Sequence, residues 1–250
     1  MTSLAAPPHT DSSAGRSQTD VVLQGVKDMI TGGTLGPGSR LPVEKDLAES
    51  LGVSRGSLRE GVRALCIMGV LETRQGDGTY VTSLDSSLLL APMAFMVDLQ
   101  GSEHRHDLHS VRRVLETEAA ARAALTITDE QLDEARQILD SVEPLVRTGD
   151  ERDHEVILDA DIAFHHVVAQ ASNNPALAAL IDALANRTSR SRLWLGLHKH
   201  DQVQNAHSEH RAILHALAAH QPDRARLMMD HHLLVVEDAL QDEGEDDPAQ

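Results

Sequence analysis

Short apolar helical patterns separated by glycine-rich turns occupy the first third of the chain. The residues Val21, Val22, Val26, Met29 and Ile30 repeat at helical spacing, and the segment GGTLGPG that follows ends this helix. Two further short helices are predicted over LPVEKDLAESLG and SRGSLREGVRALCIMG, with Gly52 in the turn between them. The segment VLETRQGDGTYV then predicts two strands around a Gly-Asp-Gly turn. This order of elements predicts a winged helix-turn-helix domain over residues 19–83.

The rest of the chain carries longer helical patterns and no alternating strand pattern. The apolar spacing predicts helices near residues 86–99, 105–124, 128–147, 152–172, 175–197, 203–220 and 222–241. Consecutive helices of this length favour an antiparallel bundle, so we expect an all-α domain over residues 84–241. The fold class is therefore mainly α, with a small β-hairpin in the first domain.

Both ends of the chain are polar. Residues 1–18 are predicted to form a disordered arm, and residues 242–250 a short acidic tail. The start has neither the charged nor the apolar region of a signal peptide, and the longest apolar run is interrupted by Pro92. A single cysteine, Cys66, excludes an internal disulfide. We expect a cytoplasmic protein with no membrane partner.

The formal net charge of −17 is unevenly distributed along the chain. Residues 1–83 hold 8 basic and 9 acidic side chains, whereas residues 84–250 hold 14 and 30. Strong negative charge normally disfavours nucleic acid as a partner, but here it belongs to the second domain. The first domain is close to neutral and remains a candidate for binding DNA.

Two arginines indicate that the third helix of the first domain is its DNA-recognition helix. Ser54 is placed to cap this helix, and Arg55 and Arg59 then lie one turn apart on the face opposite Leu58. Arginine at this end of a helix can reach guanine edges or phosphates in a major groove. Gly56 keeps the first turn slim enough for a close approach to DNA.

The turn of the hairpin adds a second set of candidate DNA contacts. It carries Arg74, Gln75, Gly76 and Gly78, from which a side chain or an amide can enter a minor groove. Two exposed arginines on a helix usually do no more than interact with solvent. The complete order of elements favours DNA binding here.

The segment LPVEKDLAESLGVSRGSLREGVRALCIMGVLETRQGDGTYV resembles the DNA-binding domain of the GntR family of bacterial transcription regulators, without a gap from about Val26 to Val81. The resemblance implies DNA contacts at Lys45, Ser54, Arg55, Gly56, Arg59, Gln75 and Gly76. Lysine at position 45 and glycine at position 56 depart from the residues usual in the family.

Four polar residues lie on the apolar faces of different helices in the second domain. Asp161 and His165 are four residues apart on the inward face of one helix, and His210 and His232 lie on the inward faces of two others. Such groups are costly to bury unless something neutralises and coordinates them. Three imidazoles and one carboxylate suit a divalent metal, zinc first, with nickel, manganese or iron as alternatives.

A single inward histidine is more often a hydrogen-bonded core residue than a metal ligand, and the chain has 15 histidines. Only the combination of the four side chains favours a metal site. His207 and His231 become the ligands in place of their neighbours if the helix phase is shifted by one residue.

The second domain resembles the FCD effector domain of the FadR branch of the same family. Five motifs carry the resemblance: SVRRVLE (110–116), DIAFH (161–165), SNNP (172–175), EHRAI (209–213) and MDHHL (229–233). The resemblance implies metal ligands at Asp161, His165, His210 and His232, and it points away from an acyl-CoA effector and toward a small organic acid. It also implies effector contacts at Arg112 and Asn174.

Together these features predict a metal-containing regulator that binds palindromic operator DNA as a homodimer. One divalent ion per subunit and a small carboxylate effector are expected, with repression released by the effector. Two alternatives stay open: a metal-dependent enzyme acting on a small substrate, and a regulator whose signal is the metal ion itself.

Overall fold

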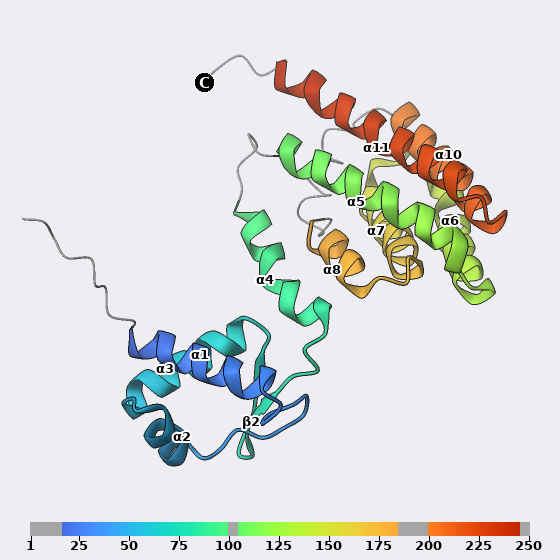
Figure 1. Cartoon of the computed structure of the whole chain (residues 1–250). Coiled ribbons are helices and arrows are strands. Elements are labelled where there is room, and N and C mark those ends of the chain that lie inside the picture. Colours follow the sequence, from blue (N-terminus) through green and yellow to red (C-terminus); the bar gives the residue numbers. More distant parts are fainter. Residues whose placement is uncertain (1–16, 100–104, 185–199, 246–250) are drawn as a thin grey trace, which may run out of the picture. The chain divides into compact units, whose positions relative to one another are not determined.

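A computed structural model describes residues 17–99, 105–184 and 200–245 of the chain (Figure 1). The chain divides into two compact units, Met1–Leu84 and Asp85–Gln250. Each unit has hydrophobic clusters of its own, and each is described by itself below.

The first unit contains three helices followed by a hairpin. Its elements are α1 (Gln18–Thr31), α2 (Glu44–Leu51), α3 (Arg55–Ile67), β1 (Leu71–Arg74) and β2 (Gly78–Val81). Val22, Val26, Leu47, Leu58 and Leu65 are buried in its core, as the apolar spacing predicted. This is a winged helix-turn-helix.

Local sequence signals fix the ends of these helices. Ser17 and Asp20 form a capping box at the start of α1, so the helix already includes Gln18, which the sequence placed in the arm. Gly52 adopts a left-handed conformation, φ 65°, at the end of α2. A Cβ on Gly61 would lie 2.5 Å from a methyl group of Val22, so this glycine lets α1 and α3 pack closely.

The wing is a two-stranded antiparallel hairpin in which Leu71 pairs with Val81 and Arg74 with Gly78. Its three-residue turn places Gly76 at φ 76°, a conformation that glycine adopts without strain.

The second unit contains helices throughout the part that the structure describes. They are α4 (Ser86–Asp98), α5 (Arg105–Thr126), α6 (Asp129–Thr148), a short 3-10 turn (Glu151–Asp153), α7 (His154–Ala171), α8 (Pro175–Leu184), α10 (His200–Ala218) and α11 (Pro222–Glu245). This confirms the predicted fold class. The second half of the helix predicted over 175–197 lies outside the described residues.

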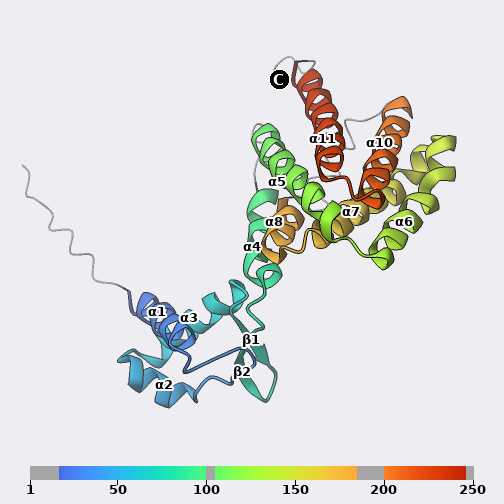
Figure 2. The same cartoon turned by 45° about the vertical axis from the view of Figure 1, so that its right-hand side comes forward.

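The bundle is held by packing along α5, α7, α10 and α11. Helix α5 lies beside α11, α7 packs on both α5 and α6, and α10 contacts α11 and α6 (Figure 2). Their shared core contains Phe164, Ile213, Leu217, Met229 and Leu233, all of them inaccessible to solvent. Inward side chains of these helices therefore meet in a dry interior.

Helix α11 continues to Glu245, so the first four residues of the predicted acidic tail are helical. The rest of that tail, and residues 1–16 of the predicted arm, lie outside the described residues. No described helix is both long enough and apolar enough to cross a membrane.

Candidate functional site

The structure brings the four predicted metal ligands together inside the bundle. Asp161 and His165 come from α7, His210 from α10 and His232 from α11, and their ligand atoms all lie within 4.8 Å of one another. All four side chains are buried. Their coming together follows from the helix packing, because each residue lies on the inward face of its helix.

The three separations that involve His210 are close to those of ligands around one small ion. Nε2 of His210 lies 3.2 Å from Nε2 of His165 and 3.1 Å from Nε2 of His232. Oδ1 of Asp161 lies 3.4 Å from the same His210 nitrogen. Two donors about 2.1 Å from a common zinc ion lie about 3.4 Å apart at the tetrahedral angle.

Two glutamates that the sequence did not single out as partners of the imidazoles fix their orientation. Glu116 on α5 accepts a hydrogen bond from Nδ1 of His165, and Glu209 accepts one from Nδ1 of His232 at 2.8 Å. A carboxylate that accepts from Nδ1 places the proton there, so the lone pair of each ring resides on Nε2. Both lone pairs therefore face His210 Nε2.

This arrangement is suited to a cation at its centre. The Nε2 atoms of His165 and His232 and Oδ1 of Asp161 all lie within 3.4 Å of Nε2 of His210. Among the described residues that bond within the cluster, the carboxylates of Asp161, Glu116 and Glu209 oppose one guanidinium, that of Arg112, which leaves two formal negative charges. A divalent ion would neutralise them and accept the lone pairs, so the donor set fits a metal.

The alternative ligands occupy different surroundings. His231 is largely exposed, with its side chain at 60%, and points toward Glu209 rather than into the cluster. His207 lines a cavity of about 10 Å³ that also touches Asp161 and His210, and its Nε2 has no hydrogen-bond partner among the described residues. Burial lowers the pKa of His207, with a smaller contribution from Arg211.

The two predicted effector residues also have structural partners. Arg112 is buried and its Nε donates to Glu116, which links it to His165 through a shared carboxylate. Asn174 caps α8, since its Oδ1 accepts a hydrogen bond from the backbone of Leu177 at 3.2 Å. The i, i+4 spacing of Arg112 and Glu116 could have indicated the first pair, but nothing in the sequence shows that both are buried.

In the first unit, the start of α3 is exposed and capped. Ser54 accepts a hydrogen bond from the backbone of Ser57 at 3.1 Å, and its own N–H is bound by the side chain of Gln18. Arg55 is exposed, and no ion pair to it is found among the described residues. A Cβ on Gly56 would meet only the Ser54 hydroxyl at 3.7 Å, so packing does not demand a glycine there.

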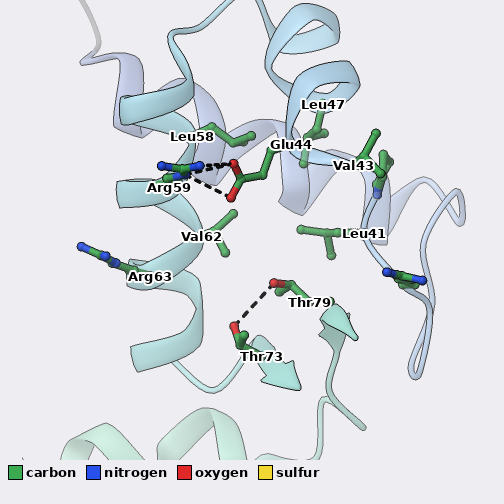
Figure 3. A pocket seen from close by; sticks show the side chains of 13 residues that line it. Leu41, Val43, Glu44, Leu47, Leu58, Arg59, Val62, Arg63, Thr73 and Thr79 are labelled. Atoms are coloured by element: carbon green, nitrogen blue, oxygen red, sulfur yellow. Dashed lines mark hydrogen bonds and ion pairs between the residues drawn. The ribbon is translucent and has the colours of Figure 1, made fainter. Parts of the chain in front are cut away.

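Arg59 is held at the rim of a groove of about 530 Å³ between α3, the start of α2 and the wing (Figure 3). Its guanidinium forms an ion pair with Glu44 at 2.8 Å, in which both side chains are more than half exposed. The hydrogen bond from Arg59 lowers the pKa of the Glu44 carboxyl. Leu41, Leu58 and Val62 line the groove, and Arg63 also projects from α3 (Figure 3).

The wing carries a second group of polar side chains. Arg74 pairs with Glu72 at 2.6 Å and stacks over the ring of Tyr80, 4.2 Å from its centroid. Arg40, which the sequence did not single out, bonds the backbone carbonyl of Asp77. Gln75, Gly76 and Lys45 are exposed.

A winged helix joined to an all-helical domain with a buried polar cluster defines the class of ligand-responsive DNA-binding regulators. Comparison with known families gives the same result: residues 18–81 match the bacterial regulatory proteins of the gntR family, and residues 107–234 match the FCD domain. The chain belongs to the GntR family and carries an FCD domain.

Similar proteins align over nearly the whole chain. The HTH-type transcriptional regulator LutR of Bacillus subtilis is 35% identical over 85% of this chain and 96% of its own length. A putative L-lactate dehydrogenase operon regulatory protein of Escherichia coli is 28% identical over 92% and 89%. The solved structure of a GntR protein of Streptococcus agalactiae has a TM-score of 0.60 at 27% identity, covering 88% of this chain and 99% of that one.

These comparisons establish what kind of protein this is. The chain is a ligand-responsive transcription regulator, and its GntR domain implies double-stranded DNA as a partner. Its FCD domain implies a small-molecule effector. Its relatives and domains are those of regulators rather than enzymes, so the metalloenzyme alternative is wrong.

Proposed function

We propose that this regulator holds one divalent metal ion per subunit, most favourably zinc, and that a small carboxylate effector completes the coordination of that ion. The observation that carries this proposal is the orientation of His165 and His232 by Glu116 and Glu209, which turns their lone pairs toward His210 and Asp161. When bound, the ion supplies an electrophilic centre that an oxygen anion can address. The buried position favours a resident ion over one that binds and leaves as the signal.

Arg112 is proposed to hold the effector carboxylate, and Asn174 to contact the effector from the start of α8. Arg112 is suited to this role because Glu116 fixes its position and its burial in a dry interior strengthens its attraction for an anion. A ligand that binds beside Glu116 can also shift His165, and through it the contacts of α5 with α7.

In the first unit, we propose that DNA contacts come from the start of α3, from α2 and from the wing. The residues are Lys45, Ser54, Arg55, Gly56, Arg59, Arg74, Gln75 and Gly76. Their exposure and the capped start of α3 support this interface. Binding should weaken steeply as salt increases, since the charged contacts are few and the second domain is acidic.

We further propose a homodimer in the cytoplasm that binds a palindromic operator and acts as a repressor. Val111 and Val114 on α5 are 49% and 69% exposed, which favours a covering partner, and a second copy of the chain would supply one. Replacing Val114 with Asp should convert the dimer to monomer in sedimentation velocity, whereas Glu130→Asp, at the exposed start of α6, should not.

The proposal is tested by operator release. A DNA sequence is first selected from a random pool by the metal-loaded protein, and its binding is then followed by fluorescence anisotropy while small carboxylates are added. We expect release by a carboxylate in metal-loaded protein only. Release by chelator or added metal, with no response to any carboxylate, would instead identify the ion as the signal.

A further inference from the structure

The segment that precedes α2 runs beside the wing. The backbone N–H of Leu41 donates a hydrogen bond to the carbonyl of Thr79 on β2 at 2.8 Å. The preceding residue, Arg40, forms an antiparallel bridge with Tyr80 on the same strand. These contacts fix the backbone of Arg40 against β2, so its side chain starts beside the wing.

The Arg40 side chain reaches the turn of the wing. One of its terminal nitrogens donates to the backbone carbonyl of Asp77, and the other lies 3.9 Å from Oδ1 of the same residue. Asp77 is the last residue of the three-residue turn between β1 and β2. A Cβ on Gly78 would lie 2.7 Å from Nε of Arg40, so this glycine leaves room for the guanidinium.

Tyr80 holds the same turn residue by its side chain. The phenol O–H donates to Oδ2 of Asp77 at 2.7 Å, and this hydrogen bond raises the pKa of the Tyr80 phenol. The guanidinium of Arg74 stacks over the Tyr80 ring, 4.2 Å from its centroid. Asp77 is therefore held twice, at its carbonyl by Arg40 and at its carboxylate by Tyr80.

The turn needs such contacts because it is rich in glycine. Gly76 and Gly78 flank Asp77, with φ of 76° and 146°. Glycine has more conformations to lose on folding than any other residue, so two glycines do not by themselves hold a turn in one conformation. Asp77 also places a negative charge at the turn, which repels DNA phosphates unless a cation opposes it. Arg40 both bonds the backbone of the turn and opposes this charge.

We propose that Arg40 is a positioning residue for DNA recognition by the wing. Through Asp77 it fixes the turn in the conformation that presents Gln75 and Gly76, without touching DNA itself. This inference rests on the proposed function, in which the wing contacts DNA. A minor groove offers few groups that distinguish base pairs, so a turn must enter it in one defined conformation to discriminate between them. A turn that moves would instead add contacts that any sequence supplies.

The test compares the sequences that variants of the full-length, metal-loaded protein select from a random DNA pool. Gln75→Ala first identifies the base pairs that the turn reads, as those at which the base preference falls. In Arg40→Met, the preference at the same base pairs should fall by a factor of at least about 5, the lower end of the cost of one mismatched base pair. The preference at base pairs that depend on Arg55 should stay as in wild type.

Tyr80→Phe separates positioning from direct contact. It removes the hydroxyl that bonds Asp77 and changes no charge, so it should lower the preference at the same base pairs. If Arg40 contacted a phosphate instead, Arg40→Met would weaken binding to every DNA sequence and reduce the salt dependence by about one ion, and Tyr80→Phe would have no effect. That result overturns the inference. Lys27→Met, at an exposed position on α1, is the control for the loss of one positive charge.

A spectroscopic measurement checks the contacts themselves. Tyr80 is the one tyrosine of the chain, so ¹³C-tyrosine labelling gives a single Cζ signal, whose chemical shift reports the bond of the phenol to Asp77. This signal should move in Arg40→Met, because Asp77 is released at its carbonyl, and an unmoved signal contradicts the inference. Arg40 and Asp77 are both more than half exposed, so the variant should unfold at nearly the same urea concentration as wild type.

The outcomes separate this inference from the function on which it rests. If Gln75→Ala leaves every base preference unchanged, the wing does not read DNA, and the inference is overturned together with that part of the proposed function. If Gln75→Ala lowers a preference that Arg40→Met and Tyr80→Phe both retain, the inference alone is overturned.

Discussion

Each unit of the regulator pairs a glutamate with an arginine, and the two pairs lie in opposite environments. Glu44 and Arg59 meet at the rim of the groove in the first unit, with side chains 53% and 62% exposed. Glu116 and Arg112 meet in the bundle, with side chains 3% and 5% exposed. Water screens an exposed ion pair, so its arginine can easily exchange the carboxylate for another anion. A buried ion pair is fixed, because separating it would leave each charge buried without a partner.

The difference in exposure between the two ion pairs matches the functions proposed for the two units. In the proposed DNA interface, Arg59 would exchange Glu44 for a DNA phosphate or base at little cost, because the ion pair between them is exposed. Glu116 cannot exchange its partners in the same way, because it orients His165 at the candidate metal centre. On the proposed function, the same pair of residue types would support reversible binding in one unit and a fixed site in the other.

The largest effect should come from removing the charge of the buried pair. Glu116→Gln leaves Arg112 without its carboxylate partner, and we expect the free energy of unfolding to fall by about 3–5 kcal/mol. Metal affinity should fall about 10–100-fold, because His165 loses the partner that sets its tautomer. Urea unfolding and competition with a metal-binding dye measure the two effects. Wild-type stability in this variant would show that the pair is not buried.

Acid should weaken the bundle through His109. Burial, and then the charge of Arg112, lowers the pKa of His109 to about 4 in the folded protein against 6.5 for an unperturbed histidine, so the unfolded state binds more protons between these values. Stability is therefore lost as the pH falls from 6.5 to 4, by at most roughly 3 kcal/mol. Urea unfolding at pH 7 and pH 4.5 should show a larger loss in wild type than in His109→Gln. Equal losses would contradict the shift.

In the first unit, loss of Arg55 should weaken operator binding by about 1–3 kcal/mol with little change in stability. Arg55 is exposed at the start of α3, so its truncation leaves no buried group unpaired. Fluorescence anisotropy with the selected operator measures the effect, and Arg136→Ala on the exposed face of α6 is the control. If Arg55→Ala bound the operator with unchanged affinity, the assignment of α3 as the DNA-recognition helix would be wrong.

Glu44→Gln sharpens the comparison, because it is the same chemical change as Glu116→Gln at an exposed pair. The free energy of unfolding should change by less than about 1 kcal/mol. Binding to non-operator DNA should become stronger, and its salt dependence steeper by up to about one ion, because Arg59 is no longer neutralised. Glu49→Gln, on the same helix, is the control. If Glu44→Gln lowered the free energy of unfolding as much as Glu116→Gln, the proposed energetic difference between the exposed and the buried pair would be wrong.

The smallest effect is expected at Gly56. Since a Cβ there meets only ordinary contacts, Gly56→Ala should stabilise the protein by about 0.5–1 kcal/mol through higher helix propensity. Operator affinity should fall if the backbone of α3 approaches DNA at this position. A variant that is more stable and binds equally well would remove Gly56 from the interface.

Local and periodic signals in the sequence predicted the structure most closely. The turn at Gly52, the cap at Ser54 and the hairpin around Gly76 follow from residue type and spacing, and the inward phase of α7, α10 and α11 follows from their apolar stripes. That phase indicated Asp161, His165, His210 and His232, with His207 and His231 left open as alternatives, and the structure places the first four side chains together.

The partners of these residues could not be predicted in the same way. Glu116 and His165 are 49 positions apart, and Arg59 and Glu44 are 15 apart on different helices, so only tertiary packing decides that they meet. The bond from His109 to the Leu233 carbonyl involves a backbone atom, which no side-chain pattern can reveal. The sequence therefore indicates which side chains point inward, and the structure shows what each one bonds.

Metal content measured together with native mass spectrometry tests the central claim most directly. Wild-type protein purified without chelator should contain one divalent ion per chain, and His210→Ala, which removes the imidazole that faces both other rings, should contain far less and melt at a lower temperature. Wild-type protein with no stoichiometric ion, or His210→Ala that keeps its full complement, would contradict the metal centre proposed for Asp161, His165, His210 and His232.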